Sequence, residues 1–163
     1  MYGERNIASL LDEHAVRRAR HPAIIEGEGV ITYGDLAPLV GRTAGHLRSS
    51  GIGAGDIVGV CLKDSGDHLV VMYGLARLGA VILPLDWRWS EPEKQRLAVF
   101  FGVGHVVVEP GDVIAEVTCL TVDDGWHGAV ADEDPDVPCG TGGVGPWCCP
   151  CRQAPRGAPR GPC

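Results

Sequence analysis

The residues with the most obvious chemical potential lie near the end of the 163-residue chain. Residues 139–163 read CGTGGVGPWCCPCRQAPRGAPRGPC and hold five of the seven cysteines. Cys148 and Cys151 form a CxxC pair, a spacing found in both zinc sites and thiol–disulfide redox sites. Cys139 and Cys163 are possible third and fourth zinc ligands. A zinc-binding interaction domain is therefore one hypothesis for this protein.

The surroundings of the CxxC pair favour neither chemistry. A structural zinc site usually carries a second close pair of ligands, whereas Cys139 and Cys163 each stand alone among Gly and Pro. A redox CxxC opens a helix after a strand, but Pro150 lies inside this pair and no helical pattern follows. We therefore assign no metal ligand to this segment.

Other polar motifs have simpler interpretations. The glycine-rich GIGAGD of residues 51–56 is predicted to follow a helix and open a strand, the reverse of a phosphate-binding loop, so we interpret it as a turn.

The six histidines show no HxxxH or HxH spacing, which metal-binding histidines often have. Asp123 and Asp124 precede Trp126 and could contact a metal, but an acidic loop is usually only solvated. Cys61 lies in an apolar run, where a thiol is inert packing. We predict no catalytic, cofactor-binding or metal-binding residue.

The first third of the chain is predicted to form a helix, a hairpin and a second helix. Apolar residues recur at helical spacing from Ile7 to Ala19. Two short apolar pieces separated by glycines follow within residues 23–32, which favours a hairpin. The second helix begins after Thr32, because Thr32 and Asp35 can form a reciprocal cap, and Gly51 stands where a left-handed C-terminal residue is needed.

The middle of the chain has the pattern of a βαβ unit. The runs from Ile57 to Leu62 and from Ala80 to Leu85 are apolar on both faces, as strands covered by helices on either side must be. Between them, residues 67–78 form a helical stretch that is apolar nearly all round, so we expect it to pack against more than one layer. A right-handed crossover is the usual connection of such strands.

A further helix and two strands complete the pattern. Ser90 and Glu93 predict a helix start, and the helix ends at Gly102. Strands are predicted at residues 105–108 and 117–121, separated by the turn EPGD. The alternation of strands and helices indicates an α/β fold.

Charge and hydropathy exclude several classes of protein. The net charge is −7, and all 21 acidic residues but only 11 of the 14 basic ones lie in residues 1–138. A nucleic-acid surface needs clustered Lys and Arg, so we expect no nucleic-acid partner. The N-terminal sequence lacks the apolar core of a signal peptide, and no later stretch reaches membrane-spanning length. Cys61 and Cys119 lie in apolar runs and suit reduced, buried thiols, so we expect a cytoplasmic protein.

Two motifs in the body resemble a known superfamily. ITYGDL at residues 31–36 resembles the first core motif of the adenylate-forming, or AMP-binding, enzymes, which include acyl-CoA synthetases and peptide-synthetase adenylation domains. GLARLGAVILPLDWRWSEPE at residues 74–93 resembles the second core motif. Its PLDWRWS portion with Arg88 is more similar to the acyl-CoA synthetase branch. The resemblance covers residues 6–138 and implies the N-terminal part of that fold.

The same resemblance suggests a new interpretation of the cysteine-rich segment. In the family, an acidic linker, here Asp134 to Asp136, is followed by a strand and a phosphate loop of the form SSGTTGxxKG. Codons can be chosen for Trp147 to Cys163 that read LVLSLSSGTTGRAKGAV when the frame is moved back by one base. Only the first base of each shifted codon is free, so a match to the whole loop is hard to obtain by chance. We infer a one-base frameshift between about Pro138 and Trp147.

The expected function follows from this resemblance. The parent enzyme would use ATP, Mg²⁺ and a carboxylate to form an acyl-adenylate, and would then transfer the acyl group to a thiol such as coenzyme A. The chain has no such loop in frame, so we expect an inactive fragment without cofactors. Residues 1–138 would be a truncated region of the AMP-binding domain, and residues 139–163 a disordered, out-of-frame tail. Uncovered apolar faces would cause non-specific self-association. A non-catalytic module that complements a separate ligase fragment is a further alternative.

Overall fold

The computed structural model describes residues 6–139 of the chain. Its elements in chain order are α1 (Ile7–Arg17), β1 (Pro22–Glu26), β2 (Gly29–Thr32), α2 (Tyr33–Ser49), β3 (Ile57–Cys61), α3 (Gly66–Leu78), β4 (Val81–Pro84), α4 (Glu91–Phe101), β5 (His105–Val108), β6 (Thr118–Thr121) and α5 (Asp124–Ala131). The predicted α/β class is confirmed, and the predicted tail of residues 139–163 lies outside the described residues except for Cys139.

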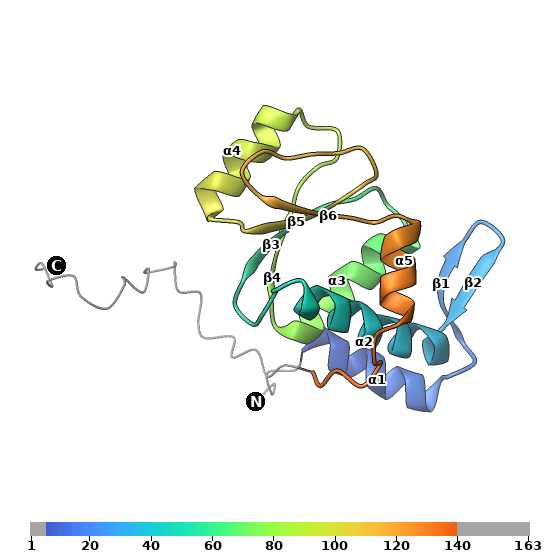
Figure 1. Ribbon diagram of the computed structural model, residues 1–163. Helices are drawn as coiled ribbons and strands as arrows, with labels where there is room; N and C mark the ends of the chain where they lie inside the picture. The colour runs from blue at the N-terminus through green and yellow to red at the C-terminus, as the bar shows by residue number, and fades with distance from the viewer. Residues whose placement is uncertain (1–5, 140–163) are drawn as a thin grey trace, which may run out of the picture.

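A four-stranded parallel sheet forms the centre of the molecule (Figure 1). The strand order is β4-β3-β5-β6, and the pairs β3–β4, β3–β5 and β5–β6 are all parallel. β1 and β2 form a separate antiparallel hairpin beside the helices. The predicted βαβ unit is therefore β3–α3–β4, with the two strands adjacent in the sheet.

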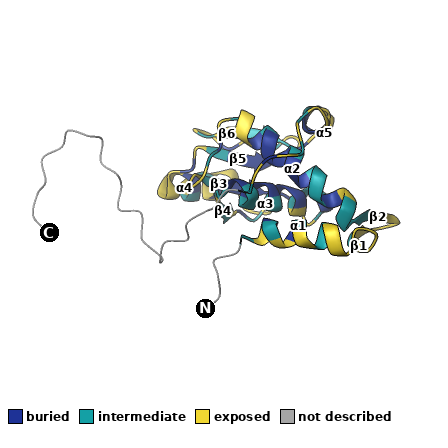
Figure 2. Ribbon diagram, turned by 90° about the horizontal axis from the view of Figure 1, so that it is seen from below, coloured by how far each residue is buried: buried dark blue, intermediate teal, exposed yellow. Residues whose placement is uncertain are grey.

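Helices cover the two faces of the sheet unequally. One core cluster joins α2, α3 and α5 to the first face through residues such as Leu47, Leu75 and Val130. A second cluster, including Cys61 and Ala98, lies between the opposite face and α4. α1 packs outside α2 and α3, and its outer side is exposed (Figure 2). The prediction that residues 67–78 contact more than one layer is confirmed, because α3 packs on the sheet, α2 and α1.

The predicted helix starts are confirmed by their capping contacts. Thr32 Oγ1 accepts a hydrogen bond from the Asp35 N–H and donates one to the Asp35 carboxylate. Ser90 and Glu93 form a capping box at the start of α4. Gly79 ends α3 in the left-handed region, where a residue with Cβ would be strained.

Three boundaries or environments differ from the prediction. α1 ends at Arg17 rather than Ala19, because the Arg18 N–H already closes the helix on the His14 carbonyl. β4 is only partly buried, because it is an edge strand, and not covered on both faces as predicted. The segment after β6 is not the solvated acidic loop expected from its sequence: it forms α5, and Asp123 caps this helix by accepting a hydrogen bond from the Trp126 N–H.

The acidic segment after α5 returns across α2 and is part of the packed structure. A Cβ on Gly41 would lie 2.0 Å from the carbonyl oxygen of Pro135, and one on Gly45 would lie 2.9 Å from the carboxylate of Glu133. Further along, Val137 is buried in the first core cluster. The glycines of α2 therefore provide the groove in which this segment lies.

Candidate functional site

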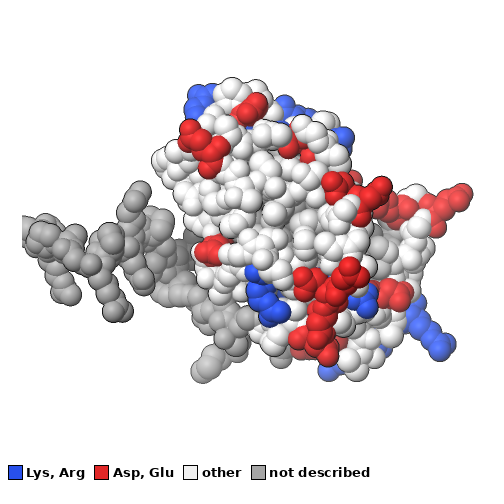
Figure 3. Space-filling model, in the orientation of Figure 1, with Lys and Arg blue, Asp and Glu red and all other residues white. Residues whose placement is uncertain are grey.

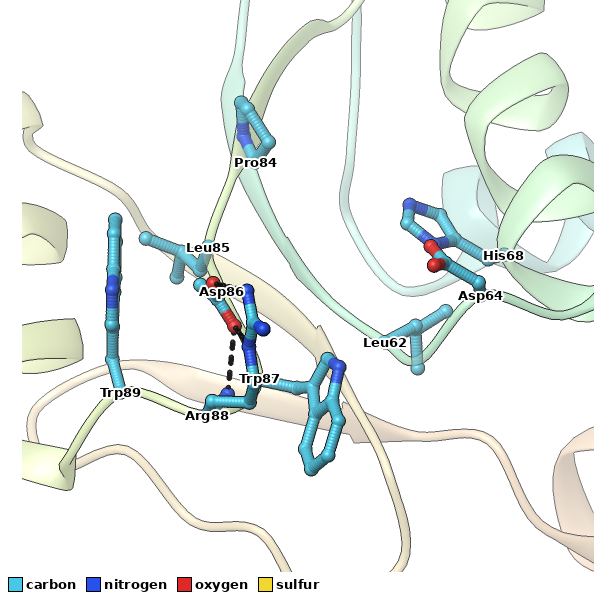
Figure 4. Close-up of a pocket in the computed structure, with 9 residues that line it drawn as sticks. All are labelled: Leu62, Asp64, His68, Pro84, Leu85, Asp86, Trp87, Arg88 and Trp89. Atoms are coloured by element: carbon cyan, nitrogen blue, oxygen red, sulfur yellow. Dashed lines mark hydrogen bonds and ion pairs between the residues drawn. The ribbon is translucent and has the colours of Figure 1, made fainter.

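A hollow lies at the carboxyl ends of β3 and β4, where open α/β sheets usually bind ligands. Its volume is about 480 Å³. Figure 4 shows that its walls come from the segments after the two strands and from α3; the lining residues are Leu62, Asp64, His68, Pro84, Leu85, Asp86, Trp87, Arg88 and Trp89. The predicted motif PLDWRWS therefore forms one wall of this hollow.

Asp86 and Arg88 form a bidentate ion pair in this wall. Arg88 donates from Nε to Oδ1 at 3.0 Å and from Nη2 to Oδ2 at 2.7 Å, and its backbone N–H also binds Oδ1. These hydrogen bonds from Arg88 lower the pKa of Asp86 to about 2. In return, the carboxylate raises the pKa of Arg88. Both groups are charged at neutral pH and largely satisfy one another.

Two tryptophans give the hollow an aromatic surface. Trp87 and Trp89 are 44% and 40% exposed, and Figure 4 shows them on opposite sides of the Asp86–Arg88 pair. Lys63 Nζ lies 5.4 Å from the centre of the Trp87 ring, within the range of a cation–π contact. Flat exposed rings beside a charged pair suit the binding of a small ligand, but they supply no nucleophile.

A buried polar cluster lies close to the carboxyl edge of the sheet. Cys61, the last residue of β3, is fully buried, and burial raises the pKa of its thiol although Lys94 opposes this effect. Lys94 Nζ lies 3.3 Å from the Asp112 carboxylate. Burial alone would lower the pKa of Lys94, but Cys61 and Asp112 outweigh it and raise the pKa. Cys61 is thus a neutral thiol, and the lysine is a charged structural group.

The candidates from sequence are dispersed, and most have structural contacts. Within residues 51–56, Gly51 and Gly55 adopt positive φ between α2 and β3, which confirms the turn interpretation. His127 Nε2 lies 3.2 Å from both Asp67 carboxylate oxygens. Among residues 6–139, no group of three or more His, Cys, Asp or Glu side chains could hold a metal ion. The CxxC pair lies outside the described residues.

Sequence reasoning missed the Asp86–Arg88 pair and the buried Lys94. The pair lies inside a recognisable motif, but its side chains meet only because the segment after β4 turns sharply. Lys94 is in the first turn of α4, a position that is usually solvated, and is buried by the distant loop that carries Asp112. Within the described residues, these groups provide a binding surface and a buried ion pair.

Acidic and basic side chains are distributed differently over the surface. On the face shown in Figure 3, acidic side chains form several groups, and the few basic ones are scattered. Among the described helices, none combines the length and apolar character needed to cross a membrane.

The amino-acid sequence matches a known protein family. Residues 11–139 match the family model described as AMP-binding enzyme. The chain belongs to the AMP-binding enzyme family. The resemblance that the two core motifs suggested is therefore confirmed.

Relatives within the AMP-binding family include ligases and peptide synthetases. Indoleacetate–CoA ligase of Aromatoleum aromaticum is 31% identical over 74% of this chain and 26% of its own length. Feruloyl-CoA synthase of an Amycolatopsis species is 31% identical over 77% of the chain and 27% of its own length. A linear gramicidin synthase of Brevibacillus parabrevis is 28% identical over 82% of the chain and 3% of its own length. The chain thus spans about a quarter of the two CoA ligases.

Solved structures of the family share the fold. The N-terminal domain of FACL13 from Mycobacterium tuberculosis superimposes with a TM-score of 0.75 at 25% identity, over 82% of this chain and 37% of that one. A fatty acyl CoA synthetase from the same organism gives a TM-score of 0.74 at 25% identity, over 82% of this chain and 29% of that one. The sheet and its helices are therefore the N-terminal part of an adenylate-forming enzyme fold.

Proposed function

We propose that this chain is the N-terminal part of an acid–thiol ligase of the acyl-CoA synthetase branch, and that the 163 residues do not catalyse adenylation by themselves. The whole enzyme would convert a carboxylate and ATP into an acyl-adenylate and pyrophosphate, and would then pass the acyl group to a thiol such as coenzyme A. The two CoA ligases at 31% identity and the PLDWRWS motif support this branch.

One observation carries the proposal of inactivity. The family match extends to residue 139, and the next residues of the chain do not contain the Ser/Thr/Gly-rich phosphate loop. Transfer of an adenylyl group needs donors and cations that stabilise charge developing on the phosphates. In the described residues, the only buried cation, Lys94, already pairs with Asp112.

A change of reading frame would explain the missing loop. For Trp147 to Cys163, codons can be chosen that encode LVLSLSSGTTGRAKGAV, a strand followed by the family's loop, when they are read one base earlier, which supports a one-base shift between about Pro138 and Trp147. Residues 139–163 are then an out-of-frame segment whose cysteines have no metal-binding role. Sequencing the encoding DNA tests this part directly, since a neighbouring frame without the loop contradicts it.

Carboxylate-dependent exchange of pyrophosphate into ATP tests the proposed function. The purified 163-residue chain, assayed with aromatic and aliphatic acids, is expected to show no exchange above a blank without enzyme. A version with the frame restored and the coding sequence continued is the matched control and should regain exchange. Exchange by the 163-residue chain, or stoichiometric zinc lost on changing Cys148 and Cys151 to Ser, would contradict the proposal.

A further inference from the structure

The outer side of α4 carries a row of exposed side chains at the spacing of a helix-packing seam. The buried residues of the helix mark its inner side, which covers the sheet (Figure 2). Four exposed side chains follow one another at intervals of four, three and four residues, and we name this row the α4 seam: Trp89, Glu93, Arg96 and Phe100. Residues at alternating intervals of four and three lie along one side of a helix and can pack on a second helix.

The two ends of the α4 seam have different shapes. Trp89 precedes the helix but belongs to the same face, because it lines a hollow of about 460 Å³ together with Glu93, Arg96 and Leu97. Phe100 lies one turn beyond this hollow and is 80% exposed. The seam therefore has a hollow beside an aromatic ring at one end and a protruding aromatic ring at the other.

The order of side chains along the α4 seam is self-complementary. Intervals of four, three and four read the same in both directions, so a two-fold axis through the middle of the seam places a second, antiparallel copy in register. Glu93 then lies opposite Arg96 of the second copy, and Trp89 lies opposite Phe100 of the second copy. Each contact occurs twice, as an isologous dimer interface requires.

The two central charges are available for such pairing. Glu93 accepts the hydrogen bonds from Ser90 through Oε2, and within the described residues Oε1 has no hydrogen-bond donor. The hydrogen bonds from Ser90 lower the pKa of Glu93, so its carboxylate is charged at neutral pH. Arg96 donates from Nε to the Pro92 carbonyl, which leaves its terminal nitrogens for a carboxylate outside this copy.

The charge of α4 favours a second copy of the chain over other partners. The helix sequence EPEKQRLAVFF contains two acidic and two basic side chains, although the whole chain has a net charge of −7. A strongly acidic or basic partner, or an anionic membrane, would therefore find no complementary charge on this side. A second copy supplies one opposite charge for each charge of the seam.

We propose that the α4 seam is a homodimer interface, on which the α4 seam of a second copy packs antiparallel. Phe100 of the second copy enters the hollow between Trp89 and Leu97, and Glu93 and Arg96 form two symmetry-related ion pairs. Trp89 also lines the candidate site, so the second copy supports one wall of that site. A helix of 11 residues buries less than the roughly 1,200 Å² of a standard interface, so the dimer is weak and dissociates on dilution.

Charge exchange between two variants of the full 163-residue chain tests the pairing. In sedimentation equilibrium with a thiol reductant, Arg96→Glu should weaken dimerisation by about tenfold or more, because two carboxylates then face each other at both contacts. A mixture of Arg96→Glu with Glu93→Arg should dimerise again, because the heterodimer regains both ion pairs. Arg48→Glu makes the same change of net charge at an exposed arginine of α2 and should associate like the wild type.

Isotope-filtered NMR on a mixture of labelled and unlabelled wild-type chains tests the register. Intermolecular contacts are expected between the indole ring of Trp89 and the ring of Phe100 of the second copy. Contacts between the two Phe100 rings are not expected, because the antiparallel arrangement places them at opposite ends of the seam. Circular dichroism of each variant shows whether the fold is retained.

Four outcomes would overturn the homodimer proposal. These are a wild-type mass that stays monomeric at all concentrations, an Arg96→Glu variant that dimerises like the wild type, a mixture of folded variants that stays as weak as its components, and intermolecular contacts between Phe100 rings. If Glu93→Arg, which loses the cap of α4, does not fold, the Arg96→Glu and NMR measurements still decide. None of these experiments involves ATP or a carboxylate substrate, so failure of the dimer leaves the proposed function standing.

Discussion

Lys94 is the only buried charged side chain among the described residues, whereas its ion-pair partner Asp112 is partly exposed to solvent. Its ammonium group is held by Asp112, whose side chain is 40% exposed, and lies near the neutral Cys61 thiol. Removing the lysine leaves a carboxylate that water can solvate. Removing the carboxylate leaves a buried ammonium without a counter-ion, which is the more costly of the two changes.

We therefore expect Asp112→Asn to lower the free energy of unfolding by about 1–2 kcal/mol, and Lys94→Met to change it by less than about 1 kcal/mol. Urea denaturation followed by tryptophan fluorescence measures both values. A greater loss of stability in Lys94→Met than in Asp112→Asn would show that the ion pair stabilises the fold by itself.

The Asp86–Arg88 pair predicts a defined pH dependence. The pKa of Asp86 is about 2 in the folded chain, below the usual value of 3.8. A lowered folded-state pKa stabilises the fold above the unfolded value, so this contribution is present above about pH 4 and is lost as the pH falls towards 2.

Replacing Arg88 by Ala should return the Asp86 titration to the range of an ordinary carboxylate. NMR detection of the Asp86 carboxyl carbon during a pH titration measures this shift. Arg96→Ala, which removes an arginine of α4 and leaves the pair intact, is the control. An unchanged Asp86 midpoint in Arg88→Ala would exclude the hydrogen bonds as its cause.

Sequence alone could not supply these side-chain contacts. The motif PLDWRWS identified the family, but whether Asp86 faces Arg88 depends on the turn after β4. Residues two apart share one face of a regular strand but not of a helix, so their spacing alone does not determine whether the side chains meet. The burial of Lys94 depends on Asp112, eighteen residues later, whose loop is placed by the sheet.

For the helices and strands, features set by residues close in sequence could be predicted, whereas features that depend on tertiary packing could not. The caps at Thr32 and Ser90 can be predicted because donor and acceptor lie within four residues of each other. α5 was not predicted because it is only eight residues long and because the two acidic residues at its start, Asp123 and Asp124, are typical of a solvated loop. The apolar spacing of Trp126 and Val130 is the available signal.

The contact between α2 and the returning segment gives a prediction for Gly41. Gly41→Ala should destabilise the fold by about 1–3 kcal/mol, because the new methyl group would overlap the Pro135 carbonyl unless the segment moves. Thermal and urea unfolding measure the change.

Gly128→Ala is the matched control, since Gly128 lies inside α5 and no atom is within 4 Å of its would-be Cβ. It should raise stability by up to about 1 kcal/mol through helix propensity. If Gly41→Ala is as stable as Gly128→Ala, residues 133–135 do not lie in the groove of α2 in solution.

For the whole molecule, the sequence predicted the βαβ unit but not the complete strand order. β5 and β6 are added on the side of β3 opposite to β4, and this choice depends on which face α4 covers. The unequal covering leaves α4 with an outward aromatic pair, Phe100 and Phe101, whose ring centres are 5.0 Å apart. Phe100 is 80% exposed.

This pair predicts concentration-dependent self-association. Phe100→Ser should lower the weight-average mass in sedimentation equilibrium at high protein concentration, with little change in stability, because the ring is already solvated. Val16→Ser on α1, where an apolar side chain of similar exposure stands apart from this pair, should have less effect. Equal masses for the wild type and Phe100→Ser would place any association elsewhere.

Both ends of the described chain are attached to the same turn of α3. The side chain of Asn6 donates to the Ala76 carbonyl, and Arg77 donates to the Val137 carbonyl and to Asp12 in α1. A pulling force applied to the two ends would therefore enter the molecule at one point and would first peel α1 and the returning segment away from α3. The parallel sheet would be loaded only after these contacts break, so mechanical unfolding should occur in two steps, with the sheet as the later and more resistant one.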